Sequence, residues 1–226
     1  METSLVDCER EVLRRSMRGP AAHVLEAGCG RRDSRADSLA EPEFGVRRVT
    51  GVDLDADAGR SNYGLDDFVV ADLCGDLPFP AGTFDLVYAS FVVEHMEAPE
   101  QAFREWRRVV RDDGAVLVVT PNMANPFMRL SARLPQWLRT QLKRLGPGVA
   151  ARDVFRAPYR ANTVRSLRQI ADASGFAIHA LNYVATLHRY AGERGLLRAL
   201  LLRAEAALPP ERRSTLVVAL RPHSRG

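Results

Sequence analysis

Two glycines and a carboxylate are spaced along the sequence as in a nucleotide site. The apolar run from His23 to Ala27 leads directly into Gly28-Cys29-Gly30, and a second run, starting at Val46, ends at Asp53. A Gly-x-Gly turn after a strand lets the backbone approach a bound ligand closely, because no side chain stands in the way. A carboxylate at the end of the next strand can accept hydrogen bonds from ribose hydroxyls. The spacing therefore predicts the nucleotide-binding half of an α/β fold.

The same turn argues against two common classes of nucleotide site. A dinucleotide fingerprint needs a third glycine, and Asp33 stands at that position. A carboxylate there would repel a pyrophosphate, so NAD(P) and FAD are disfavoured. No Gly-Lys-Ser/Thr sequence follows the turn, so a Walker phosphate loop is absent as well.

Five short apolar runs are expected to form the strands that position these residues. Runs that are apolar on both faces are typical of parallel strands covered by helices on each side. Pro99 to Arg111 carries apolar residues at helical spacing, and Asp112-Asp113-Gly114 is expected to end that helix. The alternation of strands and helices predicts a Rossmann-like, doubly wound α/β sheet. The expected strands are 23–27, 46–53, 68–73, 83–90 and 115–120.

The second half of the chain is expected to complete the same sheet. Residues 125–145 place apolar side chains on one helical face and arginines on the other, and Pro135 should divide them into two short helices. The further expected helices are 162–173 and 196–208, and the further expected strands are 176–184 and 215–220. These last two strands are expected to form an antiparallel edge of a mostly parallel sheet. We predict one domain over residues 1–226, with a helical insertion or lid at 122–160.

Charge is divided unevenly along the chain. The net charge is +4, but residues 1–121 carry 14 Lys+Arg against 23 Asp+Glu, whereas residues 122–226 carry 18 against 5. A basic half suits a phosphate, an anionic membrane surface or a nucleic acid. The alternative is that the acidic and basic halves neutralise each other when they pack.

Four segments resemble the class I S-adenosylmethionine-dependent methyltransferases in their order and spacing. They are VLEAGCG (24–30), VTGVDLDADA (49–58), VVADLCGDLPFPAGTFDLVYASFVVEH (69–95) and FREWRRVVRDDGAVLVVTPN (103–122). The resemblance covers roughly the first 122 residues, with a weaker match at 153–176, and is to bacterial members of the small-molecule type. It implies a Rossmann-like fold, methyltransferase activity and S-adenosyl-L-methionine as the cofactor.

The resemblance also implies roles for individual residues. The implied cofactor-binding residues are Glu26, Gly28, Gly30, Asp53, Leu54, Asp72, Leu73 and Ser90. Glu26 and the two glycines match the motif that holds the methionine end. Asp53 matches the carboxylate that binds the ribose, with Leu54 beside the adenine, and Asp72 matches the residue that contacts the adenine amino group. His95 is the only histidine within a motif, and it is the candidate general base.

Each assignment has a plainer alternative. Asp53 could be a helix N-cap, and Asp72 could cap a turn. His95 could hold its helix in place rather than take a proton. Cys29 is expected to be a small buried residue rather than a nucleophile, since no histidine lies near it in sequence. Arg32 stands where the family motif usually has its third glycine, which implies either a remodelled loop or weaker cofactor binding.

The acceptor of the methyl group is left open between a small molecule and a lipid-linked one. The basic helical pair at 125–145 could lie on an anionic membrane, or it could be a lid over the cofactor site. Nucleic acid is not expected as a partner, because there is no added RNA-binding module and no interleaving of aromatic and basic residues. A rival reading is a non-catalytic domain of the same fold that binds an anionic partner or a membrane surface through its basic half.

Cysteine usage and hydropathy indicate the compartment. Cys8, Cys29 and Cys74 have no paired spacing, which argues against a disulfide scaffold or a cysteine zinc site and fits a reducing environment. No apolar run approaches the roughly 18 residues that a membrane span needs. Residues 1–18 are charged and lack the apolar core of a signal peptide. We expect a cytoplasmic protein without a metal site, with peripheral membrane contact as an option.

Overall fold

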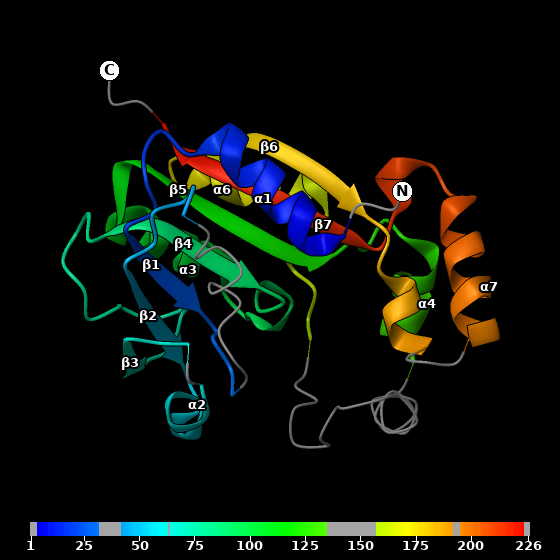
Figure 1. Cartoon of the computed structure of the whole chain (residues 1–226), viewed down its shortest axis with the longest axis horizontal. Coiled ribbons are helices and arrows are strands. Elements are labelled where there is room, and N and C mark those ends of the chain that lie inside the picture. Colours follow the sequence, from blue (N-terminus) through cyan, green and yellow to red (C-terminus); the bar gives the residue numbers. More distant parts are fainter. Residues whose placement is uncertain (1–3, 32–41, 63, 135–156, 192–194, 224–226) are drawn as a thin grey trace.

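A seven-stranded sheet forms the centre of the computed structural model, which describes residues 4–31, 42–62, 64–134, 157–191 and 195–223 (Figure 1). The strands are β1 (His23–Ala27), β2 (Arg48–Asp53), β3 (Asp67–Val70), β4 (Phe84–Ser90), β5 (Val110–Pro121), β6 (Phe176–Val184) and β7 (Thr215–Pro222). The helices are α1 (Leu5–Ser16), α2 (Ala56–Ser61), α3 (Pro99–Val109), α4 (Pro126–Arg133), α6 (Val164–Ala173) and α7 (Gly195–Ala206). Single 3₁₀ turns are η2 (Val93–His95), η4 (Leu187–Ala191) and η5 (Pro210–Arg212).

The order of the strands is β3-β2-β1-β4-β5-β7-β6. The first five run parallel, and β7 runs antiparallel to both of its neighbours. The Rossmann-like, mostly parallel fold with an antiparallel edge is thus confirmed, and β1 and β6 have the predicted bounds. The last two strands are neighbours as expected, but β7 inserts between β5 and β6, so the final strand in sequence is not the outermost one.

Helices cover both faces of the sheet, and successive strand residues alternate between two cores. On one face, α3 and α6 pack on Leu25, Val87 and Val118. On the other face, α1 packs on the neighbouring positions Val24 and Leu86, among others. Alternation of this kind requires strands that are apolar at every position, which explains the continuous apolar runs in the sequence.

The helix α1 was not predicted. Ser4 caps it, because the Ser4 hydroxyl accepts a hydrogen bond from the Asp7 N–H. A buried contact then ties the helix to the sheet, where the Tyr88 hydroxyl donates to Glu9 at 3.0 Å. The charged character of residues 1–18 hides this helix from a search for apolar runs, although its buried residues recur at helical spacing.

The predicted stop at Asp112-Asp113-Gly114 is wrong. The helix α3 ends at Val109, and the following residues already belong to β5, which pairs with β4 through an irregularity between Phe84 and Leu86. Gly114 is needed there for another reason: a Cβ on it would lie 2.6 Å from the Asp85 carbonyl oxygen. Glycine at this point therefore permits a close approach of two strands and does not end a helix.

The start of the predicted insertion is a short helix. Asn125 caps α4 by accepting hydrogen bonds from the Phe127 and Met128 N–H groups, and α4 ends at Arg133, two residues before Pro135. The second predicted helix, and most of the 122–160 insertion, lie outside the described residues. No helix in the described part of the chain is long and apolar enough to cross a bilayer.

Candidate functional site

The turn after β1 brings two glycines to the carboxyl edge of the sheet. Both have left-handed backbones, with φ of 70° at Gly28 and 64° at Gly30, which residues other than glycine rarely adopt. A Cβ on Gly28 would lie 2.4 Å from Cγ2 of Val92, whereas nothing lies within 4 Å of a Cβ placed on Gly30. Gly28 therefore lets the turn pack on the segment after β4, and Gly30 faces open space at the edge.

Asp53 connects this turn to the end of β2. Its Oδ2 accepts a hydrogen bond from the Gly30 N–H at 2.9 Å, and its Oδ1 accepts one from the Asp55 N–H at 2.9 Å. The side chain is only partly buried. The predicted pairing of glycine turn and strand-end carboxylate is thus a direct contact. The N-cap alternative is wrong for Asp53, because Asp55 is the residue that caps α2.

An ion pair between Arg31 and Asp55 adds a second link between the two loops, and sequence reasoning missed it. The neighbouring Leu54 side chain is 70% exposed, although leucine is usually buried. This edge of the sheet therefore presents an apolar surface at Leu54 and a hydrogen-bond acceptor at Asp53. Arg32, the departure from the family motif, lies outside the described residues.

Asp72 and Leu73 follow β3 at the same edge. The Asp72 carboxylate accepts a hydrogen bond from the Cys74 N–H at 2.8 Å, and its carbonyl oxygen accepts one from the Gly75 N–H. Asp72 therefore caps this turn, as the alternative interpretation expected. Asp72 is nevertheless exposed, and only one of its two carboxylate oxygens accepts this hydrogen bond, whereas Leu73 is buried.

The remaining predicted residues lie at the ends of β1 and β4. Glu26 is buried at the penultimate position of β1. Ser90 ends β4, and Phe91 after it has a left-handed backbone with φ of 54°, an unusual conformation that favours sharp re-direction of the chain. His95 ends the turn η2 and donates its backbone N–H to the Val92 carbonyl at 2.9 Å.

A buried polar network beside η2 was not predicted. Thr120, near the end of β5, donates to the Glu94 carboxylate at 3.2 Å and accepts from the Asn162 amide at 2.6 Å. All three residues are at least 95% buried. The Asn162 Oδ1 atom is buried without a hydrogen-bond partner in the described part of the chain. Only Thr120 lies in a strand, whereas Glu94 lies in η2 and Asn162 lies just before α6, so no local pattern in the sequence links the three residues.

The same network fixes the chain that precedes α6. The Tyr159 N–H donates to the Glu94 carbonyl at 3.2 Å, and Arg160 forms an ion pair with Glu97 at 2.9 Å. Tyr159 itself has a left-handed backbone with φ of 55°. Residues 159–162 therefore lie against the segment that follows β4.

Cys29 does not have the environment of a nucleophile. It is buried, and burial raises the pKa of its thiol to about 12, with the Glu26 and Asp53 carboxylates adding to the effect. Among the described residues, no three His, Cys, Asp or Glu side chains gather as they would around a metal ion.

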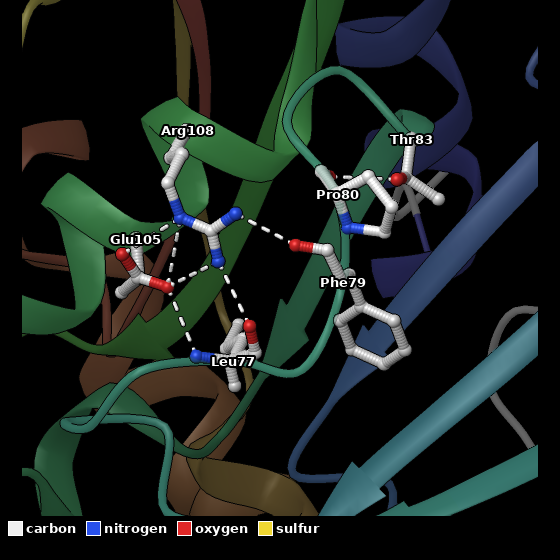
Figure 2. Close-up of polar contacts among 6 residues, drawn as sticks. All are labelled: Leu77, Phe79, Pro80, Thr83, Glu105 and Arg108. Atoms are coloured by element: carbon white, nitrogen blue, oxygen red, sulfur yellow. Dashed lines mark hydrogen bonds and ion pairs between the residues drawn. The ribbon is translucent and has the colours of Figure 1, made fainter.

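A cavity of about 680 Å³ lies at the opposite, amino edge of the sheet, lined in part by Arg104, Arg107 and Arg108. Two of these guanidinium groups already have partners. Arg107 pairs with Asp112, and Arg108 binds Glu105 together with the carbonyl oxygens of the loop before β4 (Figure 2). This cavity is therefore part of the structural framework, and the predicted site residues all lie at the other edge.

Comparison with known proteins shows similarity to methyltransferases. Residues 25–118 match a family described as "Methyltransferase domain". A Mycobacterium tuberculosis protein named "Probable S-adenosylmethionine-dependent methyltransferase" is 38% identical over 105 residues, which cover 45% of this chain and 36% of the relative. The chain thus spans about a third of the length of that curated relative.

Solved structures resemble nearly the whole chain. An S-adenosylmethionine-dependent methyltransferase from Mesorhizobium loti has a TM-score of 0.59 at 23% identity, covering 95% of each chain. Geranyl diphosphate C-methyltransferase from Streptomyces coelicolor has a TM-score of 0.60 at 16% identity, covering 95% of this chain and 78% of the other. At these identities the likeness shows a shared fold.

Proposed function

We propose that the protein transfers a methyl group from S-adenosyl-L-methionine to a small or lipid-linked acceptor, because residues 25–118 match a methyltransferase-domain family and the similar Mycobacterium tuberculosis protein is named a probable S-adenosylmethionine-dependent methyltransferase. The observation that carries the proposal is the joint placement of Gly30 and the Asp53 carboxylate at the carboxyl edge of the sheet. Ligands of doubly wound folds bind in the crevice outside this edge.

The residues present fit this cofactor. Each Asp53 carboxylate oxygen accepts one backbone N–H and keeps a second acceptor position, so the group can still take the two ribose hydroxyls as donors. The exposed Leu54 offers an apolar surface beside that carboxylate, and the free oxygen of Asp72 offers an acceptor for an exocyclic amine. Glu26, Gly28 and Gly30 would hold the methionine end, with Leu73 and Ser90 completing the cradle.

When bound, the cofactor supplies a methyl group on a sulfonium, an electrophile that needs no activation by the protein. The work of this chain is to bind and orient. The glycine turn and Asp53 would hold the donor, while the segment after β4 would place the acceptor in line with it. Glu94 fixes that segment through Thr120. If the acceptor must lose a proton, His95 in η2 is the proposed base.

The acceptor is proposed to be anionic or amphiphilic. Residues 122–226 carry an excess of basic side chains, which favours a negatively charged molecule. The structural neighbour from Streptomyces acts on geranyl diphosphate, an example of such a compound on this fold. We also propose that the chain forms a single domain with a lid at 122–160. We further propose that it has no nucleic-acid partner and that it is cytoplasmic.

A transfer assay tests the function directly. Purified protein is incubated with S-adenosylmethionine labelled in the methyl group and with isoprenoid diphosphates or anionic lipids in turn. The expected result is label in one acceptor class, which is lost with Asp53→Ala and kept with the nearby Asp57→Ala. If the wild-type protein binds the cofactor but labels none of these acceptors, the proposed acceptor class is wrong. If it does not bind the cofactor at all, the function itself is wrong.

A further inference from the structure

The helix α7 buries its carboxylate and exposes several leucines. Its one acidic residue, Glu205, is fully buried and accepts hydrogen bonds from the Leu187 and Ser214 N–H groups at 2.9 and 2.6 Å. Three of its five leucines face outward: Leu196 is 78% exposed, Leu200 is 54% exposed and Leu197 is 41% exposed. A helix that turns leucines to solvent and its carboxylate to the core is built to meet an apolar surface.

The helix α4 shows the same feature nearby. Leu130 is 64% exposed and Phe127 is 39% exposed. Of the seven large apolar side chains exposed among the described residues, five lie on α4 and α7, and the other two lie at the ends of β2 and β3. The exposure is therefore concentrated on two helices and is not scattered over the molecule.

Both helices are anchored to one short segment of the chain. The Asn125 amide, at the N-cap of α4, donates to the Arg212 carbonyl at 2.7 Å, and Glu205 of α7 holds the Ser214 N–H. The two helices consequently stand together at one end of the molecule (Figure 1). We call their exposed side chains the α4–α7 surface; its members are Phe127, Arg129, Leu130, Arg133, Leu196, Leu197, Arg198, Leu200 and Arg203.

The α4–α7 surface lies at the same edge of the sheet as the proposed cofactor site. The first residue of β7, Thr215, pairs with the last residue of β5, Pro121, and with the last residue of β6, Val184. The carboxyl end of β5 is on the same edge as the carboxyl ends of β1, β2 and β4, because those strands run parallel. Whatever docks on α4 and α7 therefore approaches the edge where the glycine turn and Asp53 lie.

The charge of the α4–α7 surface indicates what kind of partner it binds. The surface contains four exposed arginines, and neither helix exposes an acidic residue. Within the described part of the chain none of the four forms an ion pair. A second copy of the chain, docked through the same surface, would set arginines against arginines. The segment 135–156 of this chain is itself basic in sequence, so it lacks the complementary charge as well.

We propose that the α4–α7 surface docks on an anionic lipid bilayer. The exposed leucines and Phe127 enter the boundary between headgroups and acyl chains, and the arginines meet the anionic headgroups, as in interfacial helices that lie flat on a membrane. This surface adds α7 to the contact suggested by the sequence of 125–145. It goes beyond the proposed methyl transfer, because binding to lipid requires neither cofactor nor acceptor.

Vesicle co-sedimentation tests the proposal on the full chain. The vesicles consist of phosphatidylcholine alone or of phosphatidylcholine mixed with phosphatidylglycerol. Sedimentation is expected with the anionic vesicles and not with the neutral ones. Two double variants, Leu196→Ser with Leu200→Ser and Arg198→Glu with Arg203→Glu, are each expected to weaken binding at least about tenfold. The matched control, Arg104→Glu with Arg165→Glu, makes the same change of charge on α3 and α6 and should bind as the wild type does.

Three results would overturn the proposal. The wild-type protein could fail to sediment with anionic vesicles, the control could lose binding as strongly as the α7 variants, or light scattering could show a dimer that the leucine variant converts to a monomer. Binding of S-adenosylhomocysteine, measured on each variant, should stay unchanged. Loss of vesicle binding with intact cofactor binding thus concerns this surface alone, and it leaves the proposed methyl transfer untouched.

Discussion

The Asp53 carboxylate accepts a hydrogen bond from the Gly30 backbone N–H at 2.9 Å, across two loops that are 23 residues apart in sequence. This contact gives one side chain two functions. It links the glycine turn to the end of β2, and in the proposed site its remaining acceptor positions would bind the cofactor. A change at Asp53 is therefore expected to affect both the loop and the cofactor.

Replacing Asp53 with alanine should weaken binding of S-adenosylhomocysteine by at least about tenfold, because a hydrogen bond to a charged group contributes about 1.5–3 kcal/mol. Asp57→Ala is the matched control, since Asp57 is an exposed carboxylate on the adjoining helix. Titration calorimetry measures both. Equal affinities of the two variants would show that Asp53 does not bind the ribose.

Replacing Gly28 with alanine should destabilise the fold more than the same change at Gly82. Both glycines have similar left-handed backbones, with φ of 70° and 65°, so both variants carry the strain of about 1–2 kcal/mol that a Cβ causes there. Only Gly28 adds a clash, at 2.4 Å from Val92. Overpacking of this kind costs about 1–3 kcal/mol more. Chemical denaturation compares the free energies of unfolding, and equal losses would contradict the packing of the turn on the segment after β4.

Much of the fold followed from the sequence, because parallel strands covered on both faces must be apolar at every position. This requirement is visible in 23–27, whose bounds are confirmed. The bounds of 176–184 are confirmed as well, although that strand is antiparallel and partly exposed at the edge of the sheet. Features that depend on long-range contacts were missed. The start of β5 at Val110 depends on pairing with β4, and the insertion of β7 beside β5 is a matter of tertiary order that no local pattern encodes.

The candidate site was likewise predicted in part and missed in part. Gly30 and Asp53 were predicted because their spacing along two strands carries a chemical meaning. The Glu94–Thr120–Asn162 network was missed, since three polar residues from distant segments become partners only after the sheet has formed. The exposure of the α7 leucines was not predicted: the helix was expected at 196–208, but its sequence does not say which of its faces the rest of the protein covers.

Arg108 and Glu105 are predicted to make stability depend on acidity (Figure 2). The hydrogen bond from Arg108 holds the pKa of the Glu105 carboxyl below its ordinary value of 4.5. A lowered folded-state pKa contributes stability that is present above 4.5 and is lost as the pH falls through the lowered value. Glu105→Gln should thus be less stable than the wild type at neutral pH, and the gap should narrow in acid. A gap that is independent of pH, measured by denaturation across this range, would contradict the prediction.

Cys29 is predicted to resist alkylation in the folded protein. With a thiol pKa raised to about 12, only a minute fraction is thiolate in mildly alkaline buffer, and the side chain is buried as well. Iodoacetamide followed by mass spectrometry should leave Cys29 unmodified in the native state and label all three cysteines after unfolding. Rapid labelling of native Cys29 would mean that the turn after β1 opens far more readily than its contacts with Val52 and Asn62 imply.

The most direct test of the central claim is calorimetric titration of the folded wild-type protein with S-adenosylmethionine and S-adenosylhomocysteine. Paired acceptors at Asp53 and Asp72, a glycine turn and an exposed Leu54 predict one site per chain, with a dissociation constant of about micromolar order. Circular dichroism on the same sample establishes that it is folded. The absence of heat from either ligand, in a sample that is folded, would contradict the assignment of this edge as a cofactor site.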